Sequence, residues 1–219
     1  MYQYILFDLD GTISDPKIGI TRSVQYALKA FGIEEPDLDR LEPFIGPPLI
    51  DSFMEFYHMD LQQAKDAVEK YRERFSVIGL YENELYPGIG QMLEELQNNG
   101  CLLAVASSKP EIFVKKILKH FEIDRYFTAV VGSELDGTRV NKDEVVQEAL
   151  RRLFGEAEIR KNDLVMVGDR KFDVIGAKAM GLHSIAVRYG YAQGSELEES
   201  EPDHIAADVE ELKELLLKQ

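Results

Sequence analysis

Short apolar runs alternate with amphipathic stretches over most of the chain. Five of these runs are rich in Val, Ile, Leu and Ala, as strands buried on both faces of a sheet are, and they occupy residues 4–9, 101–107, 128–133, 163–169 and 183–190. Apolar positions with the helical period, bounded by Pro, Asn and Gly, predict helices over residues 88–100, 109–121, 141–155, 173–181 and 208–219. Strands that alternate with helices predict an α/β fold with a mostly parallel sheet flanked by helices.

One region breaks this alternation, because residues 15–86 carry helix signals and no convincing strand. Asp15 is a suitable cap and Pro16 suits a first helical position, and the pattern predicts helices over residues 15–32, 49–59 and 60–80. We therefore expect a helical domain, residues 15–86, inserted into an α/β core domain formed by residues 1–14 and 87–219. A helical module of this kind is a plausible lid over a site on the sheet.

Composition narrows the class of protein. The net charge of −15 over 219 residues argues against a nucleic-acid partner, although it leaves a small anionic substrate possible. No apolar run is long enough to span a bilayer and no signal peptide is evident, so we expect a cytoplasmic protein without a membrane partner.

Cys101 is the only cysteine and lies in an apolar run, which predicts a buried, inert thiol. The four histidines lack the spacing of zinc ligands.

Polar residues gather at the predicted carboxyl ends of three strands and at one helix start: Asp8, Asp10 and Thr12; Ser107 and Ser108; Asp169 and Asp173; and Lys142. Ligands of open parallel sheets bind at this edge, so we expect these side chains to lie close together. Clustered carboxylates repel one another unless a cation joins them, and oxygen ligands suit Mg²⁺. Hydroxyls, backbone N–H groups and a lysine suit a phosphate group. The set predicts phosphoryl transfer from a small phosphate ester.

Each of these features has a simpler alternative when it is taken alone. Asp8 and Asp10 could end a strand before an Asp-Gly turn, Ser107 and Ser108 could cap a helix, and Lys142 could be a solvated surface lysine. The segment GDRKFD, residues 168–173, could likewise be a turn and a cap. Four such accidents at the ends of adjacent strands are less plausible than one site.

These same residues resemble the motifs of a known family. DLDGT (residues 8–12), Ser107, Lys142 and GDRKFD are similar to the four motifs of the haloacid dehalogenase-like superfamily. The insert after the first motif resembles the small helical cap of its phosphoglycolate phosphatase-like branch, and the match covers nearly the whole chain. The resemblance implies a Rossmann-like parallel sheet flanked by helices with an inserted α-helical cap domain, and a Mg²⁺-dependent phosphatase.

The resemblance also implies roles for individual residues. Asp8 would be the nucleophile that forms an aspartyl-phosphate, and Asp10 the general acid and then the general base. The implied metal ligands are the carboxylates of Asp8 and Asp169 and the backbone carbonyl of Asp10, with Asp173 binding the metal directly or through water. The implied phosphate ligands are Gly11, Ser107, Ser108 and Lys142. The family's dehalogenases lack an acid two residues after the nucleophile, so Asp10 favours phosphate esters over halides.

Substrate choice is expected to come from the insert. Arg22 on its first helix and Gly46 in the Pro/Gly-rich loop 44–49 are candidate substrate contacts, although a solvated helix arginine is an equal alternative for Arg22. The aromatic residues of the insert are expected to form its own core; they include Phe53, Phe56 and Tyr57. Ser108 replaces an Asn that is common in the branch, which leaves contacts with the leaving group open, and residues 167–181 resemble nucleotidases of the branch.

The leading hypothesis is a phosphatase of a small phosphorylated metabolite, such as phosphoglycolate or a nucleoside monophosphate. A phosphomutase of the β-phosphoglucomutase type, a pyrophosphatase and a non-catalytic phosphate-sensing module stay open as alternatives. The sequence leaves open whether the protein is a monomer or a homodimer. Residues 194–203 are expected to form an acidic loop, to which we assign no function.

Overall fold

The computed structural model describes residues 2–155 and 161–218. It divides into two compact units, one formed by Met1–Asp15 with Leu85–Gln219 and the other by Pro16–Glu84. The first unit carries the sheet, and the second is built from helices. The roles of these units as a core domain and a cap domain stay a prediction.

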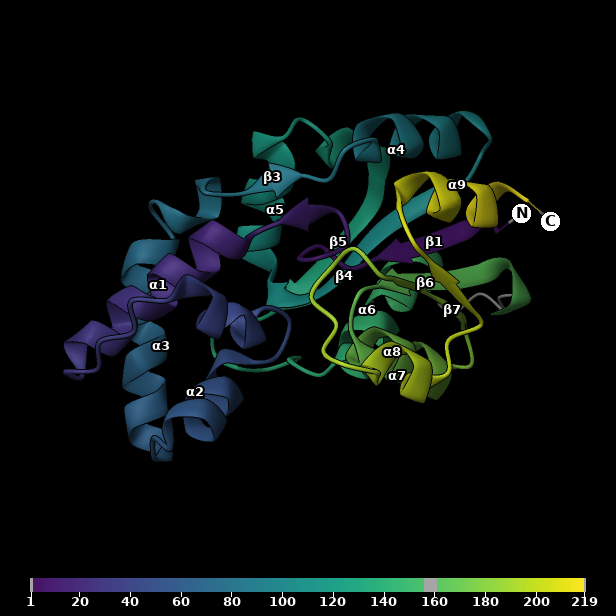
Figure 1. Ribbon diagram of the computed structural model, residues 1–219. Coiled ribbons are helices and arrows are strands. Elements are labelled where there is room, and N and C mark those ends of the chain that lie inside the picture. Colours follow the sequence, from purple (N-terminus) through teal and green to yellow (C-terminus); the bar gives the residue numbers. More distant parts are fainter. Residues whose placement is uncertain (1, 156–160, 219) are drawn as a thin grey trace. The chain divides into compact units, whose positions relative to one another are not determined.

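The first unit contains a six-stranded sheet with the order β5-β4-β1-β6-β7-β8, in which every neighbouring pair is parallel (Figure 1). The strands are β1 (Tyr4–Phe7), β4 (Leu102–Pro110), β5 (Phe127–Ser133), β6 (Leu164–Gly168), β7 (His183–Val187) and β8 (His204–Ala206). The predicted parallel α/β fold is confirmed. The apolar-run pattern missed β8, because it is a three-residue edge strand with only one fully buried residue.

Helices pack on this sheet in the predicted order, namely α4 (Ile89–Asn98), α5 (Glu111–His120), α6 (Lys142–Phe154), α7 (Lys171–Met180) and α9 (Val209–Leu217). A further helix, α8 (Glu196–Ser200), was not predicted. Helices α6 and α7 cover one face (Figure 1), where Val145 and Ala177 join Leu6, Ala104 and Met166 in one buried cluster. The alternate strand residues are buried as well, so the other face is also covered; these include Ile5, Phe7, Leu103, Val105 and Val167.

The register of the strands brings their carboxyl ends to one edge. Phe7 at the end of β1 pairs with Val105 on one side and with Val167 on the other. The residues that follow these three positions therefore emerge side by side, and they carry the predicted polar groups. Asn141 precedes α6 as the expected cap, and its backbone N–H donates to the Glu144 carboxylate at 3.1 Å.

Two local predictions are wrong. Helix α7 begins at Lys171, two residues before the predicted start at Asp173, because the Asp173 carboxylate accepts a hydrogen bond from the Arg170 backbone N–H at 3.0 Å and so caps the first turn. Residues 194–203 are not a continuous loop, since they contain α8. Acidic side chains in the first turn of α8 are favourable at the positive end of a helix.

The second unit contains α1 (Lys17–Ala30), α2 (Leu49–Tyr57) and α3 (Leu61–Phe75), with short 3₁₀ helices at Leu38–Phe44 and Gly79–Tyr81. Helix α1 begins at Lys17, one residue later than predicted, with Pro16 just before it. The aromatic residues pack around Phe44, whose ring lies 4.9 Å from that of Phe53, 5.4 Å from Phe56 and 6.0 Å from Tyr57. Phe53 is fully buried as expected, whereas Phe56 is 41 % exposed.

Short strands β2 (Ser14–Asp15) and β3 (Glu84–Leu85) form a separate two-stranded sheet. Cys101 is buried, as its apolar context predicts. Within residues 2–155 and 161–218, none of the helices has both the length and the apolar character needed to cross a membrane.

Candidate active site

Asp8 follows β1, and its carboxylate lies beside a lysine from the first turn of α6. The Nζ atom of Lys142 is 3.0 Å from Asp8 Oδ1 and 2.7 Å from Asp173 Oδ1, and it donates to the Ala106 carbonyl at 3.1 Å. All of these side chains are buried. A Cβ atom at Gly176 on α7 would come within 2.7 Å of the Lys142 side chain, so a glycine there makes room for the lysine. Lys142 is thus a buried cation held between two acids.

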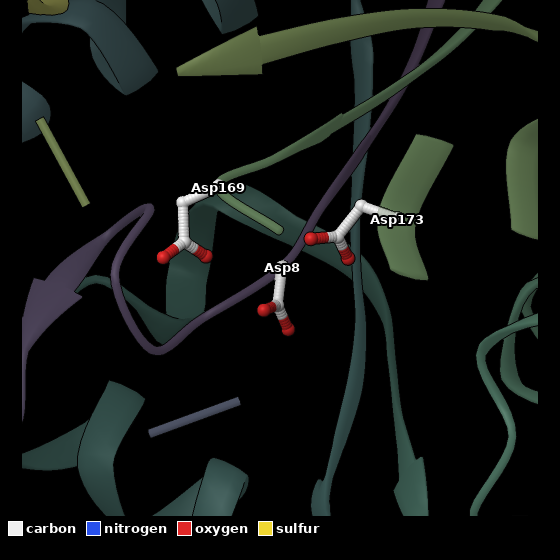
Figure 2. Close-up of side chains that lie close together, drawn as sticks. All are labelled: Asp8, Asp169 and Asp173. Carbon is white, nitrogen blue, oxygen red and sulfur yellow. The ribbon is translucent and has the colours of Figure 1, made fainter. Parts of the chain in front are cut away.

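Three carboxyl groups from separate segments lie together beside this lysine. Asp8, Asp169 and Asp173 each offer one oxygen atom, and these oxygens lie within 4.8 Å of one another (Figure 2). Asp169 accepts a hydrogen bond from the Tyr191 backbone N–H at 2.7 Å, and the Thr12 hydroxyl donates to its other oxygen at 3.4 Å. The structure therefore brings together Asp8, which follows β1, with Asp169 and Asp173, which follow β6, as the sequence predicted.

The electrostatics of this cluster disfavour three negative charges. Burial raises the pKa of Asp169 well above its ordinary value, and repulsion from Asp173 and Asp8 raises it further. Burial also raises the pKa of Asp173, against the lowering effect of Lys142. Burial alone would lower the pKa of Lys142, but attraction by Asp173 and Asp8 reverses this and raises it. One ammonium group does not compensate three buried carboxyl groups.

The donor set fits a divalent metal ion. Asp8 Oδ1 and Asp173 Oδ1 are buried and share one cation, the Lys142 ammonium, which lies 3.0 Å from the first and 2.7 Å from the second. One ammonium group leaves three clustered carboxyl groups under-compensated, and a further cation would stabilise them. Because all the donors are carboxylate oxygens, the site suits a hard ion such as Mg²⁺.

Asp10 lies in the loop after β1, and its side chain is not among the three that form the carboxyl cluster. Its Oδ2 atom accepts a hydrogen bond from the ammonium group of Lys109 at 2.5 Å, and both side chains are buried. Burial raises the pKa of Asp10, and Lys109 opposes that rise only in part. Lys109 was missed by the sequence analysis, since a lysine just after a pair of serines carries no recognisable pattern.

The predicted phosphate ligands have different surroundings. Ser107 is buried within β4, which continues to Pro110 and so past the predicted strand end, and neither Ser107 nor Ser108 caps a helix, because α5 begins at Glu111. The Gly11 backbone N–H donates to the Ser14 carbonyl at 2.8 Å and is therefore engaged in its own turn. Gly11 has a φ of +80°, and a Cβ there would come within 2.1 Å of Asp169, so the turn requires glycine.

The segment after β7 packs against the loop that follows β1, and the sequence analysis gave it no role in the site. Tyr189, Gly190 and Tyr191 follow β7; Tyr191 holds Asp169 through its backbone N–H, and the Tyr189 hydroxyl donates to the Thr12 carbonyl at 2.9 Å. A Cβ at Gly190 would lie 2.3 Å from Asp169 Cβ. The glycine at the end of an apolar strand was the available signal for this close approach.

The residue after Asp169 is tied to α8 by a buried ion pair. The Arg170 guanidinium donates from Nε to Glu196 Oε1 at 2.6 Å, and the Lys171 backbone N–H reaches the same oxygen at 3.3 Å. The Arg170 backbone N–H donates in turn to Asp173. Glu196 therefore fixes the start of the helix that carries Asp173, and the acidic segment 194–203 has a structural role that its composition did not reveal.

The two predicted substrate contacts belong to the second unit. The Arg22 side chain donates to Glu82 at 2.9 Å and is half exposed, and Arg74 pairs with the same carboxylate. Gly46 has a φ of +107°, which places a bend in the loop between α1 and α2 that favours glycine. Arg22 is thus an ion-paired residue of its own unit.

Comparison with known proteins assigns a family to this arrangement. Residues 5–187 match the family model described as haloacid dehalogenase-like hydrolase. The chain is 49 % identical over 215 residues to a 5′-nucleotidase of Pseudomonas aeruginosa, covering 98 % of this chain and 96 % of that one. It is 37 % identical to the tyrosine-protein kinase PtkA of Mycobacterium tuberculosis, covering 98 % and 72 %. A crystal structure of a predicted phosphatase from Clostridium acetobutylicum matches with a TM-score of 0.94 and 44 % identity over all of both chains.

Proposed function

This chain belongs to the haloacid dehalogenase-like hydrolase family and is a phosphatase, and we propose that it hydrolyses a small phosphate monoester with Mg²⁺ through an aspartyl-phosphate on Asp8. One observation carries the proposal: the Asp8 carboxylate lies both beside the buried ammonium of Lys142 and beside the oxygens of Asp169 and Asp173. A nucleophile and the means to compensate its charge are thereby in one place.

Asp8, Asp169 and Asp173 would hold Mg²⁺, with the backbone carbonyl of Asp10 as a further ligand. The bound ion would supply positive charge that lowers the repulsion between an anionic nucleophile and an anionic ester. Lys142 supplies a second, permanent positive charge at the Asp8 carboxylate, because its raised pKa keeps it protonated. Lys142 and the ion would approach Asp173 as well as Asp8, and we assign the attack to Asp8 because the resemblance of its DLDGT segment to the first motif of the family implies it.

Proton transfer falls to Asp10. In the first step an Asp8 oxygen bonds to phosphorus, the ester P–O bond breaks, and the leaving oxygen takes a proton from Asp10. In the second step Asp10 takes a proton from water, whose oxygen bonds to phosphorus while the bond to Asp8 breaks and inorganic phosphate leaves. A raised pKa suits a group that must be protonated at one step and deprotonated at the next.

The phosphoryl oxygens would be bound by Lys142, the Ser107 hydroxyl and backbone N–H groups near Ser108 and Gly11. Ser107 is buried in the carboxyl-terminal half of β4, on the side of the sheet where the other groups lie. The N–H of Gly11 itself is bonded to Ser14, so the contribution we propose for Gly11 is the tight turn that sets Asp8 and Asp10 side by side.

The substrate we favour is a nucleoside 5′-monophosphate, with phosphoglycolate as the other small ester to test. The 49 % identity to a protein named 5′-nucleotidase supports the first. The helical unit would select the substrate, and as a cap it would exclude water during phosphoryl transfer. Its candidate substrate contacts are Arg22 and Gly46. The ion pair of Arg22 with Glu82 would then have to rearrange, or Arg22 takes no part.

A panel of phosphate esters tests the proposal. Phosphate release is measured with Mg²⁺ from nucleoside 5′-monophosphates, phosphoglycolate, a sugar 1-phosphate and pyrophosphate, using the wild type, Asp8→Asn and the control Asp136→Asn, which changes an exposed acid of the same unit. We expect release from a monoester by the wild type and the control, and a loss of at least about a thousandfold in Asp8→Asn.

Other outcomes would contradict it. Conversion of the sugar 1-phosphate to a 6-phosphate without release would indicate a phosphomutase, and preferential release from pyrophosphate would indicate a pyrophosphatase. A stable phospho-protein with negligible release would indicate a sensing module. Activity of Asp8→Asn equal to wild type would remove Asp8 from the mechanism.

A further inference from the structure

The site contains a second buried lysine that the reaction described above does not use. Lys109 lies on β4, two residues after Ser107, and its ammonium group contacts Asp10 Oδ2 at 2.5 Å. The Lys109 side chain is 7 % exposed and that of Asp10 is 9 % exposed. A buried pair of this kind holds both groups in one geometry, because either charge would be costly to bury alone.

The two oxygens of Asp10 differ in their surroundings. Oδ2 is bound by Lys109, whereas Oδ1 is buried and accepts no hydrogen bond from the described residues. A buried carboxyl oxygen without a donor is the oxygen on which a proton is best placed. The contact with Lys109 therefore distinguishes the two oxygens and fixes the rotation of the carboxyl group.

The backbone that carries Lys109 is itself held in place. The Ser133 hydroxyl on β5 donates to the Ser108 carbonyl at 2.7 Å. Gly132 allows close packing, since a Cβ there would lie 2.4 Å from the Lys109 carbonyl oxygen. The Lys109 backbone N–H also reaches the Ser107 hydroxyl at 3.4 Å. Strand β5 thus fixes the end of β4, from which the lysine extends to Asp10.

We propose that Lys109 is the positioning residue of the proton-transferring acid: it binds Asp10 Oδ2 and leaves Oδ1 to give its proton to the leaving oxygen and to take one from water. This inference rests on the proposed function. It gives the two lysines of the site different roles, since Lys142 lies beside Asp8 and Asp173 while Lys109 lies beside Asp10.

The alternative role for Lys109 is a direct phosphate contact, and leaving-group dependence separates the two. An alkyl phosphate needs a proton on its leaving oxygen, whereas p-nitrophenyl phosphate leaves as a stable phenolate and needs little help. The parameter kcat/KM reports the steps up to release of that group. A variant that misplaces the acid should therefore slow the alkyl ester selectively, and a variant that loses a phosphate contact should slow both esters equally.

The experiment compares Lys109→Met, Lys109→Arg and the control Lys115→Met, which removes an exposed lysine paired with Glu111 on α5. The probes are p-nitrophenyl phosphate and a nucleoside 5′-monophosphate or phosphoglycolate, whichever the panel above shows to be cleaved. We expect Lys109→Met to lower kcat/KM for the alkyl ester by about tenfold or more, and for p-nitrophenyl phosphate by less than about threefold. Lys109→Arg should restore part of the loss, and Lys115→Met should match the wild type.

A double variant completes the test. Because Lys109 acts through Asp10, Asp10→Asn with Lys109→Met should lose no more activity toward the alkyl ester than Asp10→Asn alone. Thermal unfolding checks that each variant is folded. Equal losses on both esters with a raised KM, additive losses in the double variant, or wild-type activity of Lys109→Met would each overturn the inference. An inactive wild type, or an active Asp8→Asn, would instead refute the proposed function.

Discussion

Replacing Gly190 by alanine should weaken the Mg²⁺ binding that we propose, although Gly190 is not among the proposed ligands. An alanine Cβ would lie 2.3 Å from Asp169 Cβ, 2.4 Å from the Gly11 carbonyl oxygen and 2.5 Å from Asp169 Oδ2. Non-bonded heavy atoms sit at about 3.5–4.0 Å, so these groups must separate by about 1 Å. The φ of Gly190 is not in the left-handed region, so the effect is steric.

The magnitude follows from what has to move. Inserting a methyl group into a closely packed position costs about 1–3 kcal/mol of stability. Displacing Asp169, which its neighbours hold in place, should weaken metal binding by about 10–100-fold. At a Mg²⁺ concentration of about 100 Kd the wild type gains about 2.7 kcal/mol, and a site that binds 100-fold more weakly gains only about 0.4 kcal/mol.

Chemical denaturation with and without Mg²⁺ measures this directly. The matched control is Gly90→Ala, because Gly90 lies in α4 with nothing within 4 Å of the new Cβ, and alanine should there stabilise by about 0.5–1 kcal/mol. We expect Gly90→Ala to keep the full Mg²⁺ effect and Gly190→Ala to lose most of it. Wild-type stability and Mg²⁺ response in Gly190→Ala would refute both the packing argument and the place of Asp169 in the metal site.

Two further predictions concern charge. Glu196→Gln should lower the free energy of unfolding by about 3 kcal/mol, because it removes the charge that compensates buried Arg170, whereas Glu198→Gln, in a half-exposed pair with Arg188, should change it by less than about 1 kcal/mol; equal effects in urea denaturation would contradict this. The pKa of Asp169 is raised in the metal-free protein, so the folded chain holds this proton more tightly than the unfolded chain does. The free energy of unfolding therefore falls as pH rises through that pKa, and Mg²⁺ must displace the proton in order to bind. Calorimetric titration should therefore show Mg²⁺ affinity rising with pH and then levelling off; affinity that does not change with pH would contradict it.

The strand ends could be predicted from the sequence because they follow from local patterns. Apolar runs predicted five strands, and parallel strands bring the residues that follow them to one edge. Asp8 and Asp169 are close at that edge because β1 and β6 are neighbours, an order that the apolar runs do not determine. Lys142 could be placed because Asn141 predicts a helix start there. Lys142 and Asp169 lie 134 and 161 residues from Asp8 along the chain, and periodicity and topology placed all three at one edge.

The supporting contacts could not be predicted in this way. Whether Lys109 turns toward Asp10 depends on how β5 packs on the end of β4, and that is a matter of side-chain geometry between distant segments. Glu196 is one of several acids in an acidic stretch, and only the folded chain selects it as the partner of Arg170. Gly190 gave a signal, a glycine at a strand end, but not the identity of its neighbour.

Charge explains why these supporting contacts belong to the site. The three carboxyl groups of the cluster and that of Asp10 are all buried and lie beside two buried ammonium groups, Lys109 and Lys142, so full ionisation leaves two negative charges. One divalent cation brings that sum to zero, and a phosphate ester dianion then makes it negative again. In the reaction that we propose, protonation of Asp10 would lower this charge without releasing metal or substrate, and it would put the proton on the group that gives it to the leaving oxygen. Arrival of substrate would then favour the acid form of Asp10 at the start of that reaction, and departure of the neutral alcohol would leave Asp10 ready to act as a base.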